Sequence, residues 1–460
     1  MAGIAIDASL LSLLACPRCD RPLRAQGDER LTCAGCGTGF PSLEGVPWLF
    51  AEPDHALAEW RERLDFALAT IAKDRQAAMS VLAQADLRDE TKRRLRLQAA
   101  AWLAHADELK GLLAPLGVGG SRAGYETYLA LRTRLPTDVG LTSYYGNVHR
   151  DWCWGEVENR RSLAAIVEAL GDVAPRRLLV AGAGAGRLAY DMHRSLDHEM
   201  TVALDFNPLL ILLATKLFRG ETVALHEFPL APRRLEDCAV PRELRAPAAA
   251  RHGLWPLLAS ALRPPFRDEA FDTLLTPWLI DVLPEDFPVQ AARWNRLLSA
   301  GGRWVWFGSA AFRGATPAES YSLEEALTMI REAGFDEPTV AETEIPYMDC
   351  PASRHGRRER VVTVVATKAA DAPQPERHKA LPDWLVTGSE PVPALESFRV
   401  QALSTRIHAF IMSMIDGRRS IADMATLMAE KRLMTREEGE AAIRGFLIRM
   451  YEESRRGGSL

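Results

Sequence analysis

Four cysteines near the amino terminus are spaced as metal ligands. Cys16 and Cys19 form one CxxC pair, and Cys33 and Cys36 form a second. Each pair can place two thiolates about one zinc ion, so the two pairs complete a closed tetrahedral site of the structural kind. Four buried free cysteines are the alternative. So short a segment needs the metal to fold, and we expect its unfolding to leave the other domains largely intact.

A glycine-rich turn follows an apolar strand in the middle of the chain. LLVAGAGAGRLA places Gly182, Gly184 and Gly186 between that strand and a helix, where an α/β sheet brings its backbone close to a nucleotide. The spacing is GxGxG, whereas a dinucleotide fingerprint needs a small residue where Arg187 stands. The glycines alone leave a plain strand-to-helix turn open.

An acidic residue ends the next predicted strand, in TVALDFNP. Asp205 can accept hydrogen bonds from both hydroxyls of a ribose, and Phe206 beside it is a second candidate contact with a bound nucleoside. Asn207 and Pro208 have the pattern of a helix start. This predicted strand-to-helix geometry disfavours the alternative, a solvated aspartate at a strand end.

These groups need a sheet to position them, and the hydrophobic pattern predicts one within residues 143–368. The strand candidates there are LLVAG, TVALDF, FDTLLTPWLI, RWVWFG and RVVTVVATK. Because they alternate with helical segments, we expect an α/β fold with a mainly parallel sheet. Around it we expect an N-terminal zinc ribbon at 1–50, a helical connector at 51–142, a Pro-rich linker at 369–396 and a small helical module at 397–460.

The composition supports packed cores and gives no general attraction to polyanions. Of 460 residues 47% are apolar, and 56 Lys and Arg against 61 Asp and Glu leave a net charge of −5. We therefore expect no DNA partner. No run approaches the roughly 18 apolar residues of a membrane span, and the first residues do not resemble a secretory signal. We expect a cytoplasmic protein with no membrane partner.

Several phrases together resemble the carnosine N-methyltransferase-like family across about residues 143–368. They are HRDWCWGEVENRRSLAAIVEAL, AGAGAGRLAYDM, TPWLIDVLP and YSLEEALTMIREAGF. The GxGxG turn is also similar to the first motif of class I S-adenosylmethionine-dependent methyltransferases. The resemblance implies a Rossmann-like class I methyltransferase sheet, S-adenosylmethionine as the cofactor, and methyl transfer to nitrogen of a small metabolite or peptide.

The resemblance also implies roles for single residues. Arg150 lies in an RDW helix that covers the cofactor in that family, so it is expected to reach the methionine carboxylate, with Asn147 nearby. A surface ion pair beside a core tryptophan is the alternative for Arg150. Asp281 is the candidate for orienting or deprotonating the acceptor nitrogen, or else it caps a helix. Trp278 could face the sulfonium or the adenine, or belong to the core.

Two departures from the family concern the substrate. Arg313 stands where the carnosine enzymes have a substrate-contacting histidine, and Arg357, Arg358 and Arg360 stand in a stretch that is tyrosine-rich in those enzymes. Guanidinium groups recognise carboxylates. The changes favour an acidic or carboxylate-bearing substrate over carnosine, or else these arginines form a solvated face.

The two ends of the chain carry resemblances of their own. Residues 1–50 resemble the small zinc-ribbon partner protein that activates several translation-related methyltransferases. Residues 397–456 loosely resemble PqqD-like peptide-recognition modules, or a winged-helix-like unit, with Ser420 as a helix cap and Thr435 and Glu438 as a capping box. This module is expected to bind a peptide or protein partner, or to form a helical cap on the enzyme.

We therefore expect an S-adenosylmethionine-dependent methyltransferase that also binds a structural zinc ion (Zn2+). Two alternatives stay open, a methyltransferase-fold scaffold that recruits a peptide or protein without catalysis, and an RNA methyltransferase. The intact glycines and Asp205 favour the enzyme. An RNA enzyme would need a basic surface and an NPPY-like tetrapeptide after the fourth strand, where this chain has TPWL.

Overall fold

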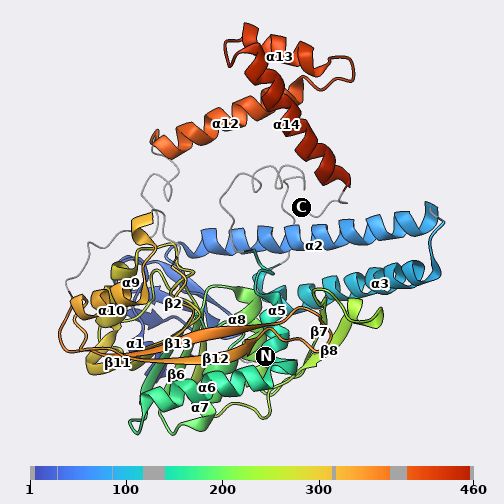
Figure 1. Ribbon diagram of the computed structural model, residues 1–460. Coiled ribbons are helices and arrows are strands. Elements are labelled where there is room, and N and C mark those ends of the chain that lie inside the picture. Colours follow the sequence, from blue (N-terminus) through green and yellow to red (C-terminus); the bar gives the residue numbers. More distant parts are fainter. Residues whose placement is uncertain are drawn as a thin grey trace. The chain divides into compact units, whose positions relative to one another are not determined.

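A computed structural model of the chain shows two units, each described here by itself (Figure 1). The first unit is Met1–Ala380 and the second is Leu381–Leu460. The structure describes residues 6–27, 30–84, 86–117, 140–312, 317–372 and 391–455. The predicted substrate residue Arg313 and most of the predicted Pro-rich linker therefore lie outside the described residues.

A seven-stranded sheet forms the centre of the first unit, in the order β12-β13-β11-β10-β5-β6-β9. In that order the strands are Thr339–Tyr347, Arg357–Thr367, Leu298–Gly308, Phe271–Pro277, Arg177–Ala181, Met200–Asp205 and Leu254–Leu258. Neighbours pair in parallel, except that β13 runs antiparallel to both β11 and β12. This is the class I methyltransferase sheet, Rossmann-like in its parallel part, and the predicted fold class is confirmed.

Two hydrophobic clusters lie on the two faces of this sheet, because successive strand residues point to opposite sides. Leu178 and Val180 of β5 belong to one cluster, and Leu179 and Ala181 belong to the other. The first cluster is covered by α6 (Glu156–Leu170), α7 (Arg187–Ser195) and α8 (Pro208–Phe218). The second is covered by α1 (Ala8–Leu13), α9 (Phe287–Leu297) and α10 (Leu323–Glu332).

The five predicted strands are all present, whereas β9 and β12 were not predicted. The sequence of β9, LWPLL, contains Pro256, which argues against a central strand. Proline is tolerated here because β9 is the edge strand of the seven-stranded sheet. β12 is also an edge strand, and most of its first residues are exposed and polar, so it lacks a buried stripe. A separate hairpin, β7 (Val223–Glu227) with β8 (Val240–Leu244), was likewise not predicted.

The N-terminal ribbon is built into the sheet domain. Its four strands are β1 (Leu23–Ala25), β2 (Arg30–Cys33), β3 (Gly39–Leu43) and β4 (Val46–Pro47). The buried ribbon residues Leu31 and Phe40 belong to the same cluster as Leu179 and Val202 of the sheet. Just after β4, the Leu49 N–H donates to the Leu258 carbonyl at 2.7 Å. This shared core favours joint unfolding of the ribbon and the sheet over the expected independent unfolding of the ribbon.

The predicted helical connector consists of two long helices, α2 (Pro53–Gln84) and α3 (Asp89–Leu112). Trp60 of α2 and Leu109 of α3 are buried in the first cluster, so the hairpin is anchored on the sheet domain. After the undescribed residues 118–139, the chain continues through α5 (Tyr145–His149) and a short π-helical turn, η2 (Arg150–Trp154).

The second unit contains the three predicted helices, α12 (Glu396–Ser413), α13 (Ile421–Glu430) and α14 (Arg436–Arg455). Its small core includes Met424, Met428 and Ile443. Both predicted caps are confirmed, since Ser420 forms a capping box with Asp423, and Thr435 exchanges hydrogen bonds with Glu438. None of the described helices in either unit is long and apolar enough to cross a membrane.

Candidate active site

The glycine turn lies at the carboxyl edge of the sheet, beside the position where the strand order reverses between β5 and β10. Gly182, Gly184 and Gly186 have φ angles of 72°, 57° and 80°, a region that side chains disfavour. A Cβ on Gly184 would meet no atom within 4 Å. At Gly184 the backbone therefore faces open space, as a nucleotide site requires, whereas Gly182 and Gly186 pack closely against Leu279 and Phe218.

Asp205 ends β6 and supports this turn. One carboxylate oxygen accepts a hydrogen bond from the Gly184 N–H at 2.9 Å, and the other accepts one from the Asn207 N–H at 2.9 Å. Burial raises the pKa of Asp205 to about 6, against the lowering effect of these bonds. The Phe206 N–H also bonds to the carboxylate, so of its roughly four acceptor sites about one remains for a ligand. The carboxylate thus fits the predicted role of ribose acceptor.

The affinity for S-adenosylmethionine should fall as the pH drops through about 6. Because the pKa of Asp205 is raised from 3.8 to about 6 in the folded protein, it adds stability that is fully present below pH 3.8 and is lost as the pH rises through about 6. Cofactor binding should change in the opposite direction, because the ionised carboxylate is the stronger acceptor for ribose hydroxyls.

We expect the Kd to rise by up to about tenfold per pH unit below pH 6. Calorimetry from about pH 5 to about pH 8 measures this change, and Asp205→Asn should remove most of it. A wild-type Kd that is independent of pH in this range would contradict an ionised Asp205 as the ribose acceptor.

The RDW segment covers the glycine turn. The Trp152 indole N–H donates to the Ala185 carbonyl at 2.9 Å, and its ring packs edge-on against Tyr190. Arg187 stands where a dinucleotide fingerprint needs a small residue. Its guanidinium lies 5.4 Å from the centre of the Trp152 ring and donates a hydrogen bond to the Asp151 carbonyl at 2.8 Å. The large residue at this position therefore holds the covering segment against the turn.

Arg150 forms a buried ion-pair network at the start of η2. Its guanidinium contacts the carboxylates of Asp151 at 2.7 Å and Glu158 at 2.8 Å. Burial by itself lowers the pKa of Arg150, but these two carboxylates raise it above its ordinary value. The Nε, one Nη1 and one Nη2 proton are engaged, so two of the five N–H groups remain for a ligand. The contact of Arg150 and Asn147 with a methionine carboxylate stays a prediction.

Trp278 lies directly after β10, at the same edge of the sheet. Its φ of 52° is in the left-handed region, which is unusual for a bulky residue. Residues with such strained backbone conformations cluster at functional sites. Its N–H donates to the Phe307 carbonyl at 2.8 Å, and its ring centre lies 4.8 Å from that of Tyr347. The side chain is only partly buried, so Trp278 is not a fully enclosed core tryptophan.

Asp281 lies in the turn that follows β10 and is also partly buried. The next helix, α9, begins at Phe287, and its N-cap is Asp286, whose side chain accepts a hydrogen bond from the Phe287 N–H. The helix-cap alternative for Asp281 is therefore wrong. The role of Asp281 toward an acceptor nitrogen stays a prediction.

Two tyrosines at this edge were missed by the sequence reasoning. Burial raises the pKa of Tyr144, and the negative charges of Asp205 and Asp281 add to the rise. The phenol therefore experiences the negative charge of both candidate carboxylates. The Tyr347 ring, at the end of β12, packs against Trp278 in a tilted arrangement, and β12 was itself not predicted. The only signal for Tyr144 was its place shortly before the RDW segment.

The arginines expected to select an acidic substrate are distributed over β13. Arg357 lies 4.5 Å from the centre of the Tyr347 ring and pairs with Glu359. Arg358 pairs with Glu344 at 3.3 Å, and both side chains are more than half exposed. Arg360 is exposed. Among these three, Arg357 is the one in contact with a residue of the candidate site.

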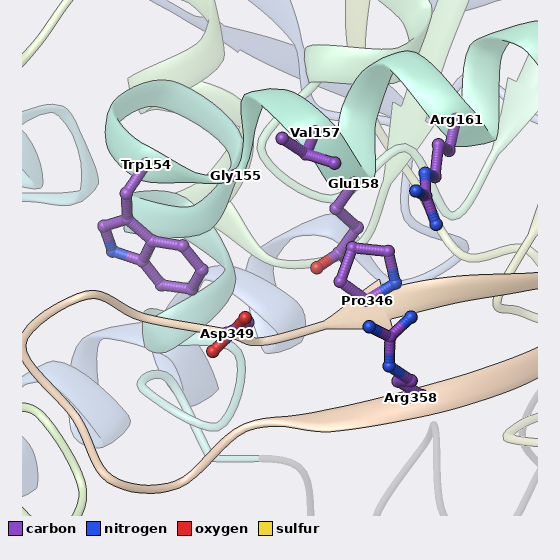
Figure 2. A pocket seen from close by; sticks show the side chains of 8 residues that line it. All are labelled: Trp154, Gly155, Val157, Glu158, Arg161, Pro346, Asp349 and Arg358. Atoms are coloured by element: carbon purple, nitrogen blue, oxygen red, sulfur yellow. The ribbon is translucent and has the colours of Figure 1, made fainter.

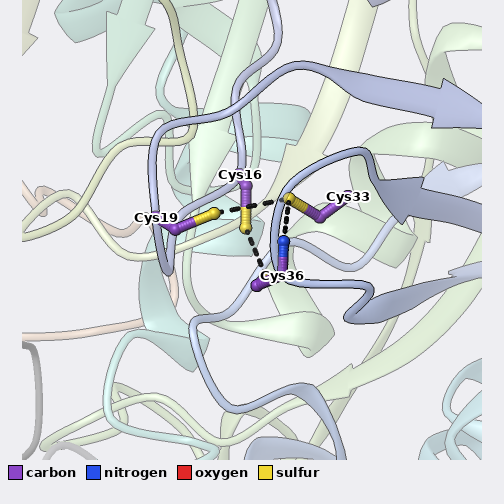
Figure 3. A group of neighbouring side chains, drawn as sticks. All are labelled: Cys16, Cys19, Cys33 and Cys36. Carbon is purple, nitrogen blue, oxygen red and sulfur yellow. Dashed lines mark hydrogen bonds between the residues drawn. The ribbon is translucent and has the colours of Figure 1, made fainter.

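The four N-terminal cysteines converge in a geometry that fits zinc (Figure 3). The Sγ atoms of Cys16 and Cys36 are 3.7 Å apart, those of Cys19 and Cys33 are 3.4 Å apart, and all four lie within 4.8 Å of one another. Tetrahedral bonds of about 2.3 Å place sulfurs roughly 3.8 Å apart. Burial raises the pKa of Cys16 and Cys19, so metal binding must displace protons from them.

Comparison with curated proteins finds relatives of the N-terminal segment. The UPF0434 protein of Stutzerimonas stutzeri is 38% identical over 61 residues, which are 13% of this chain and 98% of that protein. The UPF0434 protein of Mannheimia succiniciproducens is 40% identical over 55 residues, 12% of this chain and 90% of that protein. No family model matches the chain.

Solved methyltransferase structures align with about half of the chain. The N-methyltransferase NodS of Bradyrhizobium japonicum is 12% identical and covers 47% of this chain and 99% of its own, with a TM-score of 0.31. Phosphoethanolamine N-methyltransferase 2 of Haemonchus contortus, in complex with S-adenosyl-L-methionine, is 12% identical. The alignment covers 51% of this chain and 58% of that chain, with a TM-score of 0.33.

Proposed function

The chain belongs to the UPF0434 family through its N-terminal segment. From this segment, and from the residues at the carboxyl edge of the sheet, we propose that the protein is an S-adenosylmethionine-dependent methyltransferase. Its acceptor is a nitrogen of a small metabolite or peptide, and residues 143–368 form a catalytic domain of the carnosine N-methyltransferase-like type. The ribbon holds one structural zinc ion on Cys16, Cys19, Cys33 and Cys36.

One observation carries this proposal, the bond between the glycine turn and the strand-end carboxylate. The Gly184 N–H and an Asp205 oxygen are 2.9 Å apart, so the two sequence motifs form one cradle at the carboxyl edge. A plain strand-to-helix turn needs no buried carboxylate beneath it. Asp205 keeps an acceptor site for a ribose hydroxyl, and Phe206 next to it is the proposed adenine contact.

The remaining edge residues divide between the cofactor and the acceptor. When bound, S-adenosylmethionine supplies an activated methyl group on a sulfonium. Arg150 and Asn147 bind its carboxylate end, and the partly exposed Trp278 ring faces the sulfonium or adenine. Asp281 orients the acceptor nitrogen or takes its proton, which leaves a neutral nucleophile for transfer.

Replacing Asp205 with alanine should weaken S-adenosylmethionine binding by about 1.5 to 3 kcal/mol, roughly 10- to 150-fold in Kd, because charge-assisted hydrogen bonds to the ribose are lost. Calorimetry measures the Kd, and thermal melting checks that the variant is folded. The matched control is Asp172→Ala, at an exposed position where neither the Kd nor the melting temperature should change.

If the wild type binds no S-adenosylmethionine, the enzyme proposal gives way to the alternative of a scaffold that recruits a peptide or protein. If the wild type binds and Asp205→Ala binds equally well, the cofactor site lies elsewhere.

A further inference from the structure

A pocket of about 260 Å³ lies between the start of α6 and the end of β12, and no role has been assigned to it (Figure 2). Its lining residues are Trp154, Gly155, Val157, Glu158, Arg161, Pro346, Asp349 and Arg358. One aromatic ring, two carboxylates and two guanidinium groups therefore surround a space large enough for a small organic molecule.

The charges of this pocket are separated along its length. Figure 2 shows Asp349 beside Trp154, whereas Arg161 and Arg358 lie on the other side of Pro346. Within the described chain, no hydrogen bond or ion pair engages the Asp349 carboxylate. The negative end thus carries a carboxylate that a ligand can pair.

The two guanidinium groups at the positive end are also able to bind a ligand. Arg161 donates only to the Glu344 carbonyl, at 3.4 Å, among the residues that the structure describes. Arg358 pairs with the Glu344 carboxylate at 3.3 Å, with side chains 69% and 56% exposed, and such an exposed pair contributes little. Neither pairing prevents these guanidinium groups from binding a carboxylate of a ligand.

The walls between the two ends are held in place by other bonds. The Trp154 indole N–H donates to Glu227 at 2.9 Å, which fixes the ring. The Glu158 carboxylate is occupied by Arg150 at 2.8 Å and by the Met348 N–H at 2.9 Å. Because its side chain is buried and paired, Glu158 forms a wall of the pocket and leaves Asp349 as its free negative group.

We propose that this pocket binds a small zwitterion that carries an ammonium group at one end and a carboxylate at the other. The ammonium lies beside Asp349 and the Trp154 ring. The carboxylate lies between Arg161 and Arg358, whose planar groups suit it. A ligand with a single charge leaves one end of the pocket unpaired and binds more weakly. This site does not rest on the proposed methyl transfer.

Calorimetry on the full-length protein without cofactor tests the proposal with three amino acids of increasing charge separation, glycine, 4-aminobutyrate and 6-aminohexanoate. Butylamine and butyrate carry one charge each and serve as the comparison ligands. At least one amino acid should bind about tenfold or more tightly than both of them, since each single-charge ligand lacks one charge-assisted contact.

Two variants assign the binding to this pocket. Asp349→Asn and Arg161→Gln should each reduce the affinity for the best amino acid about tenfold or more, whereas Arg160→Gln, at the exposed neighbouring position, should leave it unchanged. The proposal is overturned if no amino acid binds at tens of millimolar, if the single-charge ligands bind as tightly, or if the variants bind like the wild type.

Discussion

Replacing Cys33 with serine should destabilise the seven-stranded sheet together with the ribbon. The ribbon residues Leu31 and Phe40 share a hydrophobic cluster with Leu179 and Val202 of the sheet, so loss of the metal site exposes sheet residues as well. A structural zinc contributes several kcal/mol or more to folding. For a domain of this size that corresponds to a drop in melting temperature of about 10 °C or more.

The same change should weaken binding of S-adenosylmethionine, although no cysteine lies in the proposed cofactor site. Leu49, just after the ribbon strand β4, donates to the Leu258 carbonyl of β9. Leu258 is paired in the sheet with Asp205, the proposed ribose acceptor. Trp60, shortly after the ribbon, packs 5.8 Å from the ring of Phe206. Loosening the ribbon therefore loosens the strand that positions the ribose acceptor.

Scanning calorimetry and cofactor titration on the same preparation test this prediction. The control is Asp172→Ala, at an exposed position outside the ribbon and the proposed cofactor site. The wild type should contain one equivalent of zinc, and Cys33→Ser should melt earlier in a single transition. Two separate transitions, with the main one unchanged, would show an independent ribbon. A wild type purified without chelators and lacking zinc would refute the metal assignment itself.

Replacing Asp281 with asparagine should lower turnover by roughly 10²-fold or more, while the Kd for S-adenosylmethionine stays nearly the same. The substitution keeps size and polarity but removes the charge that would orient or deprotonate the acceptor nitrogen. Because Asp286 caps α9, the change should not disturb that helix. The acceptor substrate for this turnover assay is to be identified first, by screening extracts of the source cell for methyl transfer from labelled S-adenosylmethionine.

Asp286→Asn is the matched control for this measurement. It removes the same charge five residues further on, and asparagine caps a helix about as well as aspartate, so turnover should be unchanged. Unchanged turnover in Asp281→Asn would reject the acceptor role. An equal loss of cofactor affinity and rate would place Asp281 in the cofactor site.

Local patterns were sufficient for many elements and motifs of this protein. The two CxxC pairs predicted a metal site because each pair sets two thiolates within a single turn. The glycines, and Ser420 and Thr435 at the helix starts, were readable because their roles depend on backbone conformation within a few residues. Five strands could be predicted from their apolar runs. Each of them lies between two other strands of the sheet, so its side chains are largely buried and apolar.

Other features depended on segments that meet only in the folded chain. The sequence of the ribbon does not show that its apolar side chains complete the core of the sheet. β9 was hidden by Pro256, which is acceptable only because tertiary structure places that strand at the edge. Asp281 is excluded as a helix cap because α9 starts later, after Asp286.

The sequence by itself therefore determined the fold class, the four cysteines of the candidate metal site and the residues of the glycine cradle, because these depend on short-range spacing and on hydrophobic period. Only the tertiary structure decided the burial of Asp205, the effect of two carboxylate charges on Tyr144, and the pocket between α6 and β12. Desolvation, charge proximity and enclosed volume arise between elements that are distant in the chain, so no local pattern encodes them.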